Sequence, residues 1–339
     1  MKRSEFLRIG VAGFVIVMLT LIFRTLAYHP GPAPDYPDSM AGPETVITIE
    51  SSESGSAIAL KLQTAGVVKS AEAFFRRAVA DSRSTRIAPG EHRIQTRVSA
   101  KTALEQLIDA KRLVNAIEVK DGAWVSEVVA QFIAAGYSKS EVRQAIKNLS
   151  LPSQFDAKSV EGFLYPAFYD FQKGESAEKI FSRMIARFED STQNIDWNLV
   201  KNYTPYQILT IASIVEAEGS PDVHRKIAQV IFNRLSARMP LQMDTTVHYI
   251  FKRRGEIALS LADTKIDSPY NTFLRTGLPP TPICNPTLAS ISAAINPEPG
   301  DWLYFVTVSP GVTRFTHSYD EFLNFKAEYK KNLAAGAFK

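Results

Sequence analysis

Two glutamates, Glu216 and Glu218, stand at the end of an apolar helical pattern in the segment TIASIVEAEG, residues 210–219. The apolar residues before them recur at helical spacing, and this spacing places both glutamates at the edges of the apolar stripe. Partial burial raises the pKa of a carboxyl group. A carboxylic acid tuned in this way can protonate a leaving oxygen at neutral pH, as in glycoside cleavage. Alternatively, the two glutamates could cap a neighbouring helix or pair with Arg225 or Arg234.

Other kinds of catalytic site find little support in the sequence. The five histidines are His29, His92, His224, His248 and His317. None of them forms H-E-x-x-H or another close ligand spacing, so we expect no metal centre. No Gly-rich phosphate loop or G-x-S-x-G turn is present, and we expect no cofactor. The net charge is only +4 and the basic residues are scattered, which argues against a nucleic-acid partner. The single cysteine, Cys284, excludes an internal disulfide.

The helix that carries the glutamates has clear predicted ends. Thr204 followed by Pro205 is typical of a helix start, and Gly219 is typical of a helix end. A second amphipathic helix is predicted in residues 222–238. Five prolines in residues 269–286 indicate a long rigid loop. Loops of this length inside a compact domain are usually functional, and we interpret this one as the wall of a pocket.

The first half of the folded chain predicts two similar segments. Residues 46–70 are predicted as strand, helix, glycine and helix, and residues 116–140 repeat this order at a constant offset of 70. Gly66 stands opposite Gly136 in this comparison. Small βα segments often look alike, so the repeat is either a coincidence or a recurrent βαα unit. A further strand follows the first repeat, so residues 45–110 predict a βααβ unit.

The N-terminus predicts a membrane anchor. An uncharged run, extended by a snorkelling Arg24, predicts a transmembrane helix over residues 9–28. Basic residues before the run place residues 1–8 in the cytoplasm. A cleaved signal peptide is the alternative, although no clean cleavage site follows. In both cases the remainder of the chain is exported. Residues 29–44 are rich in proline and predict an extended linker.

Several longer motifs occur in a defined order along the chain. They are EGFLYPAFYDF, TIASIVEAEG, IFNRL, PLQMDTTVHY, SPYNTFLRTGLPPTPICNPTLASISAAINP and WLYFVT. Together they closely resemble the endolytic murein transglycosylases, the YceG-like family of bacterial cell-wall enzymes, over roughly residues 45–330. The resemblance implies an α+β fold with an N-terminal transmembrane helix. It also implies a small βααβ LysM-like module at residues 45–115 and a mixed α+β catalytic domain at residues 116–335.

The resemblance also implies an activity and a location. The family is anchored by a single pass in the inner (plasma) membrane, with its catalytic domain on the periplasmic or extracellular side. It cuts the β-1,4 bond between N-acetylmuramic acid and N-acetylglucosamine in nascent peptidoglycan, which leaves 1,6-anhydro ends and terminates glycan elongation. Glycan synthases such as penicillin-binding proteins are the implied partners. The family's catalytic glutamate corresponds to Glu216, and one carboxyl group can act first as acid and then as base.

Other polar residues of these motifs are candidates for contacting sugars or orienting Glu216. They are Glu218, Asn233, Gln242, Asp244, Tyr270, Asn271 and Asn285.

The chain departs from the family pattern at several positions. Met243 and Thr245 replace a serine and a proline, and Ala167 lacks a carboxylate that the family has. Thr313 and Phe322 stand where the family tends to have histidines. These departures leave an alternative open, in which the chain is an anchored wall-binding scaffold, or an adaptor that recruits synthases, with weak or no catalysis.

Overall fold

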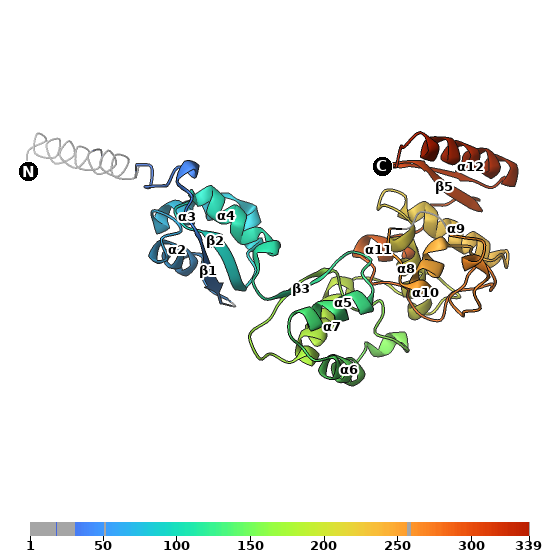
Figure 1. The fold of residues 1–339 in the computed structure, drawn as a ribbon, viewed down its shortest axis with the longest axis horizontal. Coiled ribbons are helices and arrows are strands. Elements are labelled where there is room, and N and C mark those ends of the chain that lie inside the picture. Colours follow the sequence, from blue (N-terminus) through green and yellow to red (C-terminus); the bar gives the residue numbers. More distant parts are fainter. Residues whose placement is uncertain (1–17, 19–30, 51, 256–258, 339) are drawn as a thin grey trace, which may run out of the picture. The chain divides into compact units, whose positions relative to one another are not determined.

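The computed structural model describes residues 18, 31–50, 52–255 and 259–338. The chain divides into two compact units, one up to Asn115 and one from Ala116 onward (Figure 1). Nearly all of the predicted transmembrane segment, residues 9–28, lies outside the described residues. Within the described part of the chain, no helix combines the length and the apolar character that crossing a bilayer requires.

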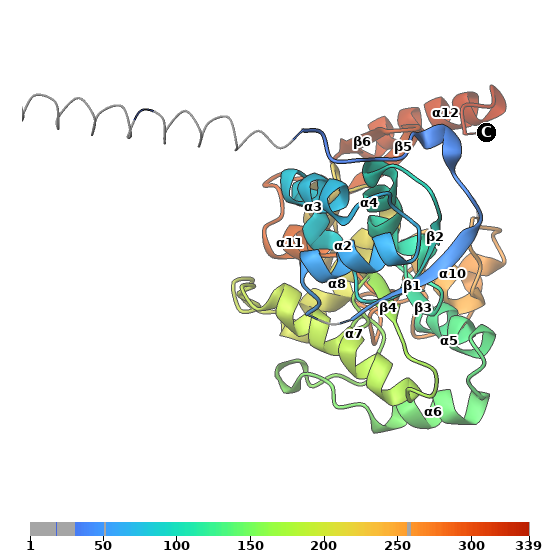
Figure 2. The ribbon, with the colours of Figure 1, turned by 90° about the vertical axis from the view of Figure 1, so that its left-hand side faces the viewer.

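The first unit has a strand–helix–helix–strand order followed by a third helix. Its elements are η1 (Asp38–Met40), β1 (Glu44–Ile49), α2 (Gly55–Thr64), α3 (Ala71–Ala80), η2 (Ser82–Arg86), β2 (Gly90–Gln95), α4 (Ala100–Ile108) and η3 (Ala110–Arg112). Strands β1 and β2 pair antiparallel, with Ile47 opposite His92. Helix α3 packs beside both α2 and α4 (Figure 2). The predicted βααβ order is therefore present.

The second unit begins with the same order of elements. These elements are β3 (Ala116–Val119), α5 (Val125–Ala134), α6 (Lys139–Asn148), η4 (Ser153–Phe155) and β4 (Ala167–Asp170). Strands β3 and β4 again pair antiparallel. Gly66 and Gly136 both have positive φ, +70° and +99°, at the end of the first helix of each unit. The cap of the second helix differs, because Ser70 caps α3 whereas Ser138, not Ser140, caps α6.

The remainder of the second unit is mainly helical. Its elements are α7 (Ala177–Thr192), α8 (Pro205–Glu218), α9 (His224–Ser236), α10 (Asp244–Phe251), η5 (Asp263–Lys265), α11 (Leu288–Ile295), β5 (Tyr304–Ser309), β6 (Val312–Thr316) and α12 (Tyr319–Ala334). Strands β5 and β6 form an antiparallel hairpin, and α12 packs against β5. The predicted mixed α+β class is confirmed.

Helix α8 is the central element of the second unit and contacts α9, α10 and α11. It begins as predicted, because the Thr204 side chain accepts the N–H of Gln207 and the Gln207 side chain accepts the N–H of Thr204. The predicted apolar stripe understates its burial. Every residue from Ile208 to Val215 is buried, since other helices surround α8. Glu216 and Glu218 are half-buried where the helix leaves this core.

Candidate functional site

The last turn of α8 directs its two glutamates toward different neighbours. Residues two apart on an α-helix are rotated by about 200° around its axis. Glu216 therefore reaches α11, where it bonds Thr287 and Ser290. Glu218 reaches α10, where it bonds Thr245. The two carboxyl groups belong to separate local environments rather than to one acidic pair.

One carboxylate oxygen of Glu216 is held by three donors at the start of α11. Its Oε2 accepts the Thr287 N–H at 2.9 Å, the Thr287 hydroxyl at 2.6 Å and the Ser290 hydroxyl at 2.7 Å. The first N–H groups of a helix lack partners within the helix, and its positive dipole end favours a carboxylate. From the described residues, Oε1 of Glu216 receives no hydrogen bond. One oxygen is thus fixed, and the other can meet a substrate.

This arrangement changes the sequence-based interpretation of Glu216. The apolar stripe predicted a desolvated carboxyl group, whereas the structure surrounds Oε2 with polar donors. The alternative, that a glutamate caps a neighbouring helix, describes this contact correctly. Thr287 and Ser290 were not among the predicted site residues. Ser290 follows Thr287 by three residues at the start of the apolar helix α11. Hydroxyl residues with this spacing are typical of a helix N-terminus, and this pattern could have indicated both residues.

A tight turn after β3 covers the other side of Glu216. Gly122 has φ +65°, and a Cβ added there would lie 3.5 Å from Cγ of Glu216. The preceding residue, Asp121, lies within electrostatic reach of Glu216. Asp121 is exposed, but partial desolvation of its carboxyl group and the charge of Glu216 both raise its pKa. A second carboxyl group therefore lies beside Glu216, and no motif in the sequence indicated it.

Glu218 is bonded to the start of α10. Its Oε1 accepts the Thr245 hydroxyl at 2.5 Å and the Thr245 N–H at 3.3 Å. Burial and, less strongly, the charge of Asp244 raise the pKa of Glu218 to about 7, although the hydrogen bonds from Thr245 and the charge of Arg234 lower it. The guanidinium groups of Arg225 and Arg234 donate to main-chain carbonyls. Glu218 thus ties α8 to α10 through Thr245, a position where the chain departs from the family pattern.

Asn285, predicted to contact sugar or orient Glu216, is a fully buried brace. Its Oδ1 accepts the N–H groups of Gly162 and Leu164 at 3.0 and 2.9 Å, and its Nδ2 donates to the Ala123 carbonyl at 2.8 Å. Its main chain also pairs with Gly122 and Ala123. Asn285 therefore orients the Gly122 turn beside Glu216. Of the two predicted roles, this geometry favours orientation over a direct sugar contact, because the side chain is enclosed by main chain.

Asn271, predicted to contact sugar or orient Glu216, is likewise fully buried. Its Nδ2 donates to the carbonyls of Thr264 and Ile266, and its Oδ1 accepts the Phe273 N–H. Asn271 thus holds the proline-containing loop in shape through bonds to its main chain.

Asn233 is half-buried, and its side-chain amide donates to the Trp302 carbonyl at 2.8 Å. This bond joins α9 to the segment before β5.

The other predicted site residues, Gln242, Asp244 and Tyr270, are more exposed to solvent than Asn271 and Asn285. Gln242 is exposed, with φ +52°, and its N–H donates to the Thr272 carbonyl. Asp244 is half-buried at the start of α10, and burial raises its pKa. The Tyr270 hydroxyl lies 2.9 Å from the Thr281 hydroxyl within the loop. Asp244 lies beside Glu218. The Gln242 side chain accepts a hydrogen bond from Arg234 of α9 at 3.4 Å, whereas the Tyr270 hydroxyl bonds within its own loop.

The chain is similar to known proteins over most of its length. The profile of the YceG-like family matches residues 47–328. This chain belongs to the YceG-like family. The endolytic murein transglycosylase of Bacillus subtilis (strain 168) is 31% identical to this YceG-like chain over 304 residues, which cover 84% of each protein.

A pneumococcal relative and a solved structure from Listeria monocytogenes are also similar to the chain. The endolytic murein transglycosylase of Streptococcus pneumoniae (strain ATCC BAA-255 / R6) is 32% identical over 213 residues. The match covers 60% of this chain but only 36% of the pneumococcal protein, so the chain spans about a third of that relative. The crystal structure of the yceG-like protein lmo1499 from Listeria monocytogenes matches with a TM-score of 0.58 and 26% identity. That match covers 83% of this chain and 98% of the other.

This YceG-like protein also has a carboxyl group that is more deeply buried than Glu216 and Glu218 and was not among the predicted site residues. Glu161 is 4% exposed and accepts the Val125 N–H and the Tyr249 hydroxyl, both at 3.0 Å. Burial raises its pKa to about 7. The exposed Lys252 places its ammonium group 3.2 Å from the centroid of the Tyr249 ring. Glu161 is the first residue of the EGFLYPAFYDF motif, so the motif marks a tie between α5 and α10.

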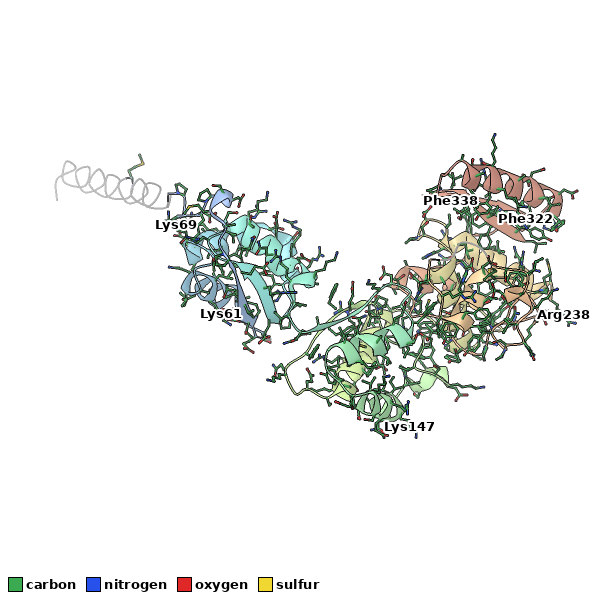
Figure 3. The ribbon with its side chains drawn as sticks, viewed as in Figure 1. Lys61, Lys69, Lys147, Arg238, Phe322 and Phe338 are labelled. Carbon is green, nitrogen blue, oxygen red and sulfur yellow. The ribbon has the colours of Figure 1, made fainter. Side chains whose placement is uncertain are left out.

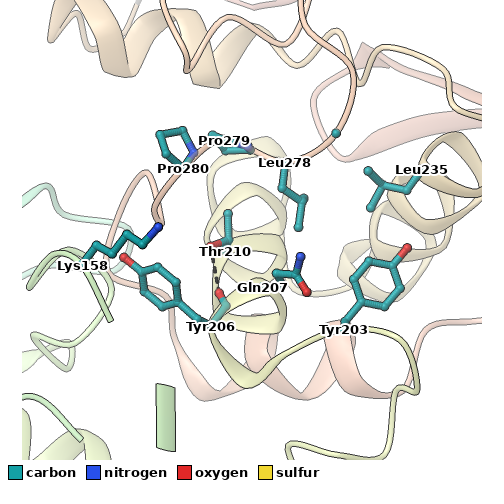
Figure 4. A pocket seen from close by; sticks show the side chains of 10 residues that line it. Lys158, Tyr203, Tyr206, Gln207, Thr210, Leu235, Leu278, Pro279 and Pro280 are labelled. Carbon is teal, nitrogen blue, oxygen red and sulfur yellow. Dashed lines mark hydrogen bonds between the residues drawn. The ribbon is translucent and has the colours of Figure 1, made fainter. Parts of the chain in front are cut away.

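A pocket of about 380 Å³ lies at the N-terminal end of α8 (Figure 4). Tyr203, Tyr206 and Lys158 line it, together with the loop at Pro279. Glu216 is ten residues beyond Tyr206, which is about 15 Å along the helix axis. The pocket is therefore separate from the carboxyl groups. Among the described residues, no group of three or more histidine, cysteine or acidic side chains could hold a metal ion.

Proposed function

We propose that this chain is an endolytic murein transglycosylase that cleaves the glycan strands of peptidoglycan. The observation that carries the proposal is the asymmetric binding of Glu216, whose Oε2 is held by Thr287 and Ser290. A lytic transglycosylase uses a single carboxyl group as acid and then as base, in contrast to the carboxyl pair of most glycosidases. Membership of the YceG-like family and the relatedness to named transglycosylases support the same activity.

The proposed reaction needs only the proton carried by Glu216. Oε1 of Glu216 donates its proton to the glycosidic oxygen while the bond from C1 to that oxygen breaks. The resulting carboxylate then accepts the proton of the C6 hydroxyl group, whose oxygen forms the new bond to C1. The product is a 1,6-anhydro end, no water is consumed, and Glu216 returns to its protonated state. We propose the β-1,4 bond between N-acetylmuramic acid and N-acetylglucosamine as the bond that is cut.

The cellular setting is part of the proposal. We infer a single transmembrane helix at residues 9–28, with both units on the outer side of the inner membrane. The uncharged run and the basic residues before it support this topology. We also propose that the LysM-like module at residues 45–115 docks on glycan. Cleavage close to the membrane would release nascent strands from glycan synthases and so end their elongation.

The test is mass spectrometry of glycan strands incubated with the purified full-length protein. We expect 1,6-anhydro ends from the parent and a loss of at least about 10²–10⁴-fold for Glu216→Gln, which keeps the shape but removes the titratable proton. The matched control is Glu189→Gln, at an exposed position on α7. New reducing ends would instead identify a hydrolase. A parent that leaves the strands unchanged would favour the scaffold alternative.

A further inference from the structure

The C-terminal hairpin and α12 carry a cluster of three aromatic rings. Tyr304 of β5 lies 5.6 Å from Tyr319 and 5.1 Å from Phe322, measured between ring centroids, and Tyr319 and Phe322 are 6.1 Å apart. Tyr319 is 56% exposed, and the other two rings are half-buried. We name these three residues the aromatic patch.

The aromatic patch is too open to be an ordinary packing core. A surface helix normally buries an apolar stripe against its neighbour. Helix α12, however, has no buried residue along its length. Leu323, next to Phe322, is also 45% exposed. Aromatic side chains combine a large apolar face with polar edges, and they leave this face toward solvent chiefly where a partner covers it.

Charged side chains connect the aromatic patch to the environment of Glu218. The guanidinium carbon of Arg234 lies 5.2 Å from the centroid of the Tyr304 ring, and the charge of Arg234 acts on Glu218. From the other side, the Lys326 ammonium group lies 5.5 Å from the Phe322 ring centroid. The charge of Lys326 acts on Asp244, at the start of α10. The patch therefore lies close enough to the C-terminal end of α8 for Arg234 and Lys326 to contact its rings and also act on Glu218 and Asp244.

We propose that Tyr304, Tyr319 and Phe322 form a sugar-binding subsite for the glycan strand on the Glu218 side of the cleaved bond. The inference rests on the proposed function and adds a subsite to it. A pyranose ring has a flat face of C–H groups that packs against aromatic rings, while its polar edge can bond neighbouring charged groups. The exposed Lys326 supplies such a group at one border of the patch, whereas the buried Arg234 supports the Tyr304 ring from below and donates to main-chain carbonyls. The patch includes Phe322, at a position where the family tends to have histidine, so the proposed contact there is ring packing rather than a hydrogen bond.

The experiment measures binding of N-acetylglucosamine oligosaccharides to the full-length protein by calorimetry, in the Glu216→Gln background so that no probe is cleaved. Phe322→Leu keeps apolar packing but removes the flat ring, and Tyr319→Ala removes the most exposed ring. The matched control is Tyr329→Ala, because Tyr329 lies on the same helix but pairs with Phe338, beyond the C-terminal end of α12. Phe322 and Phe338 lie toward opposite ends of α12 (Figure 3).

We expect Phe322→Leu and Tyr319→Ala each to weaken oligosaccharide binding by roughly 2- to 12-fold, the size of one aromatic contact. Tyr329→Ala should bind like the background protein. Equal binding by all three variants would overturn the subsite. A parent that releases anhydro ends from strands yet binds no oligosaccharide would also overturn the subsite, while leaving the proposed function intact. A parent that does neither would remove the proposed function itself.

Discussion

Removing the Thr287 hydroxyl should slow strand cleavage without weakening glycan binding. Thr287→Val keeps the β-branched shape and the main-chain N–H, and it deletes one of the three donors to Oε2 of Glu216. The Thr287 side chain makes no capping bond to α11, so the substitution should leave the helix start intact. A hydrogen bond to a charged group contributes about 1.5–3 kcal/mol. Because two donors remain, we expect a loss near the lower limit, about 10-fold in kcat.

Ser290→Ala tests the same anchor from the next turn of α11. The Ser290 hydroxyl is buried and lies 2.7 Å from Oε2 of Glu216. We expect a loss of similar size, and a larger loss in the double variant with Thr287→Val. The matched control is Ser292→Ala, which makes the same change at an exposed position on the same helix. Thr287→Ser, which restores a hydroxyl group, should recover most of the activity.

The assay is the rate of release of anhydro ends at several glycan concentrations. KM should stay close to the parent value, because these hydroxyl groups hold Glu216 rather than the sugar. Thermal unfolding should confirm that each variant is folded. If Thr287→Val and Ser290→Ala are both folded and as fast as Ser292→Ala, the anchored oxygen of Glu216 does not matter for catalysis. If KM rises instead of kcat falling, the hydroxyl groups bind substrate directly.

Two further predictions concern stability. The pKa of Glu161 is about 7 in the folded protein, whereas its ordinary value is 4.5. Between pH 4.5 and pH 7 the folded state therefore binds more protons than the unfolded state, and the free energy of unfolding falls as the pH rises through this range. Glu161→Gln should remove up to about 3 kcal/mol of this pH dependence, measured by chemical denaturation at pH 5 and pH 8. Asn285→Ala should lower the unfolding free energy by about 2–4 kcal/mol, because the buried N–H groups of Gly162 and Leu164 lose their acceptor. A change below about 0.5 kcal/mol in the same measurement, which is the size of an ordinary surface substitution, would contradict this prediction.

Local signals predicted the elements well. The capping pair of Thr204 and Gln207 sets the start of α8, and the bonds involved span only three residues. The glycines at the ends of α2 and α5 adopt positive φ for the same local reason, since a side chain disfavours that conformation. The apolar period of α8 was less informative. A period identifies an apolar face, but it does not state how many other helices will cover the remaining faces.

The hydrogen-bond partners of the polar residues were harder to predict from the sequence than the helices and strands. Asn285 belongs to a motif that looks suited to sugar binding, yet its side chain is enclosed by the main chain of Gly162, Leu164 and Ala123. The donors and the acceptor lie 121 to 162 residues away in the sequence. Residue type indicates what an amide can bond. Only the folded arrangement decides whether a sugar or the protein's own backbone satisfies it.

The sequence by itself determined that Glu216 and Glu218 stand at the end of a buried helix, because capping and hydrophobic spacing act within a few residues. The tertiary structure decided what each carboxyl group meets. The donors to Glu216 come from Thr287 and Ser290, 71 and 74 residues later, and the donor to Glu218 comes from Thr245. The orientation of a carboxylate depends on partners that packing brings together, and no local pattern records which helix will pack there.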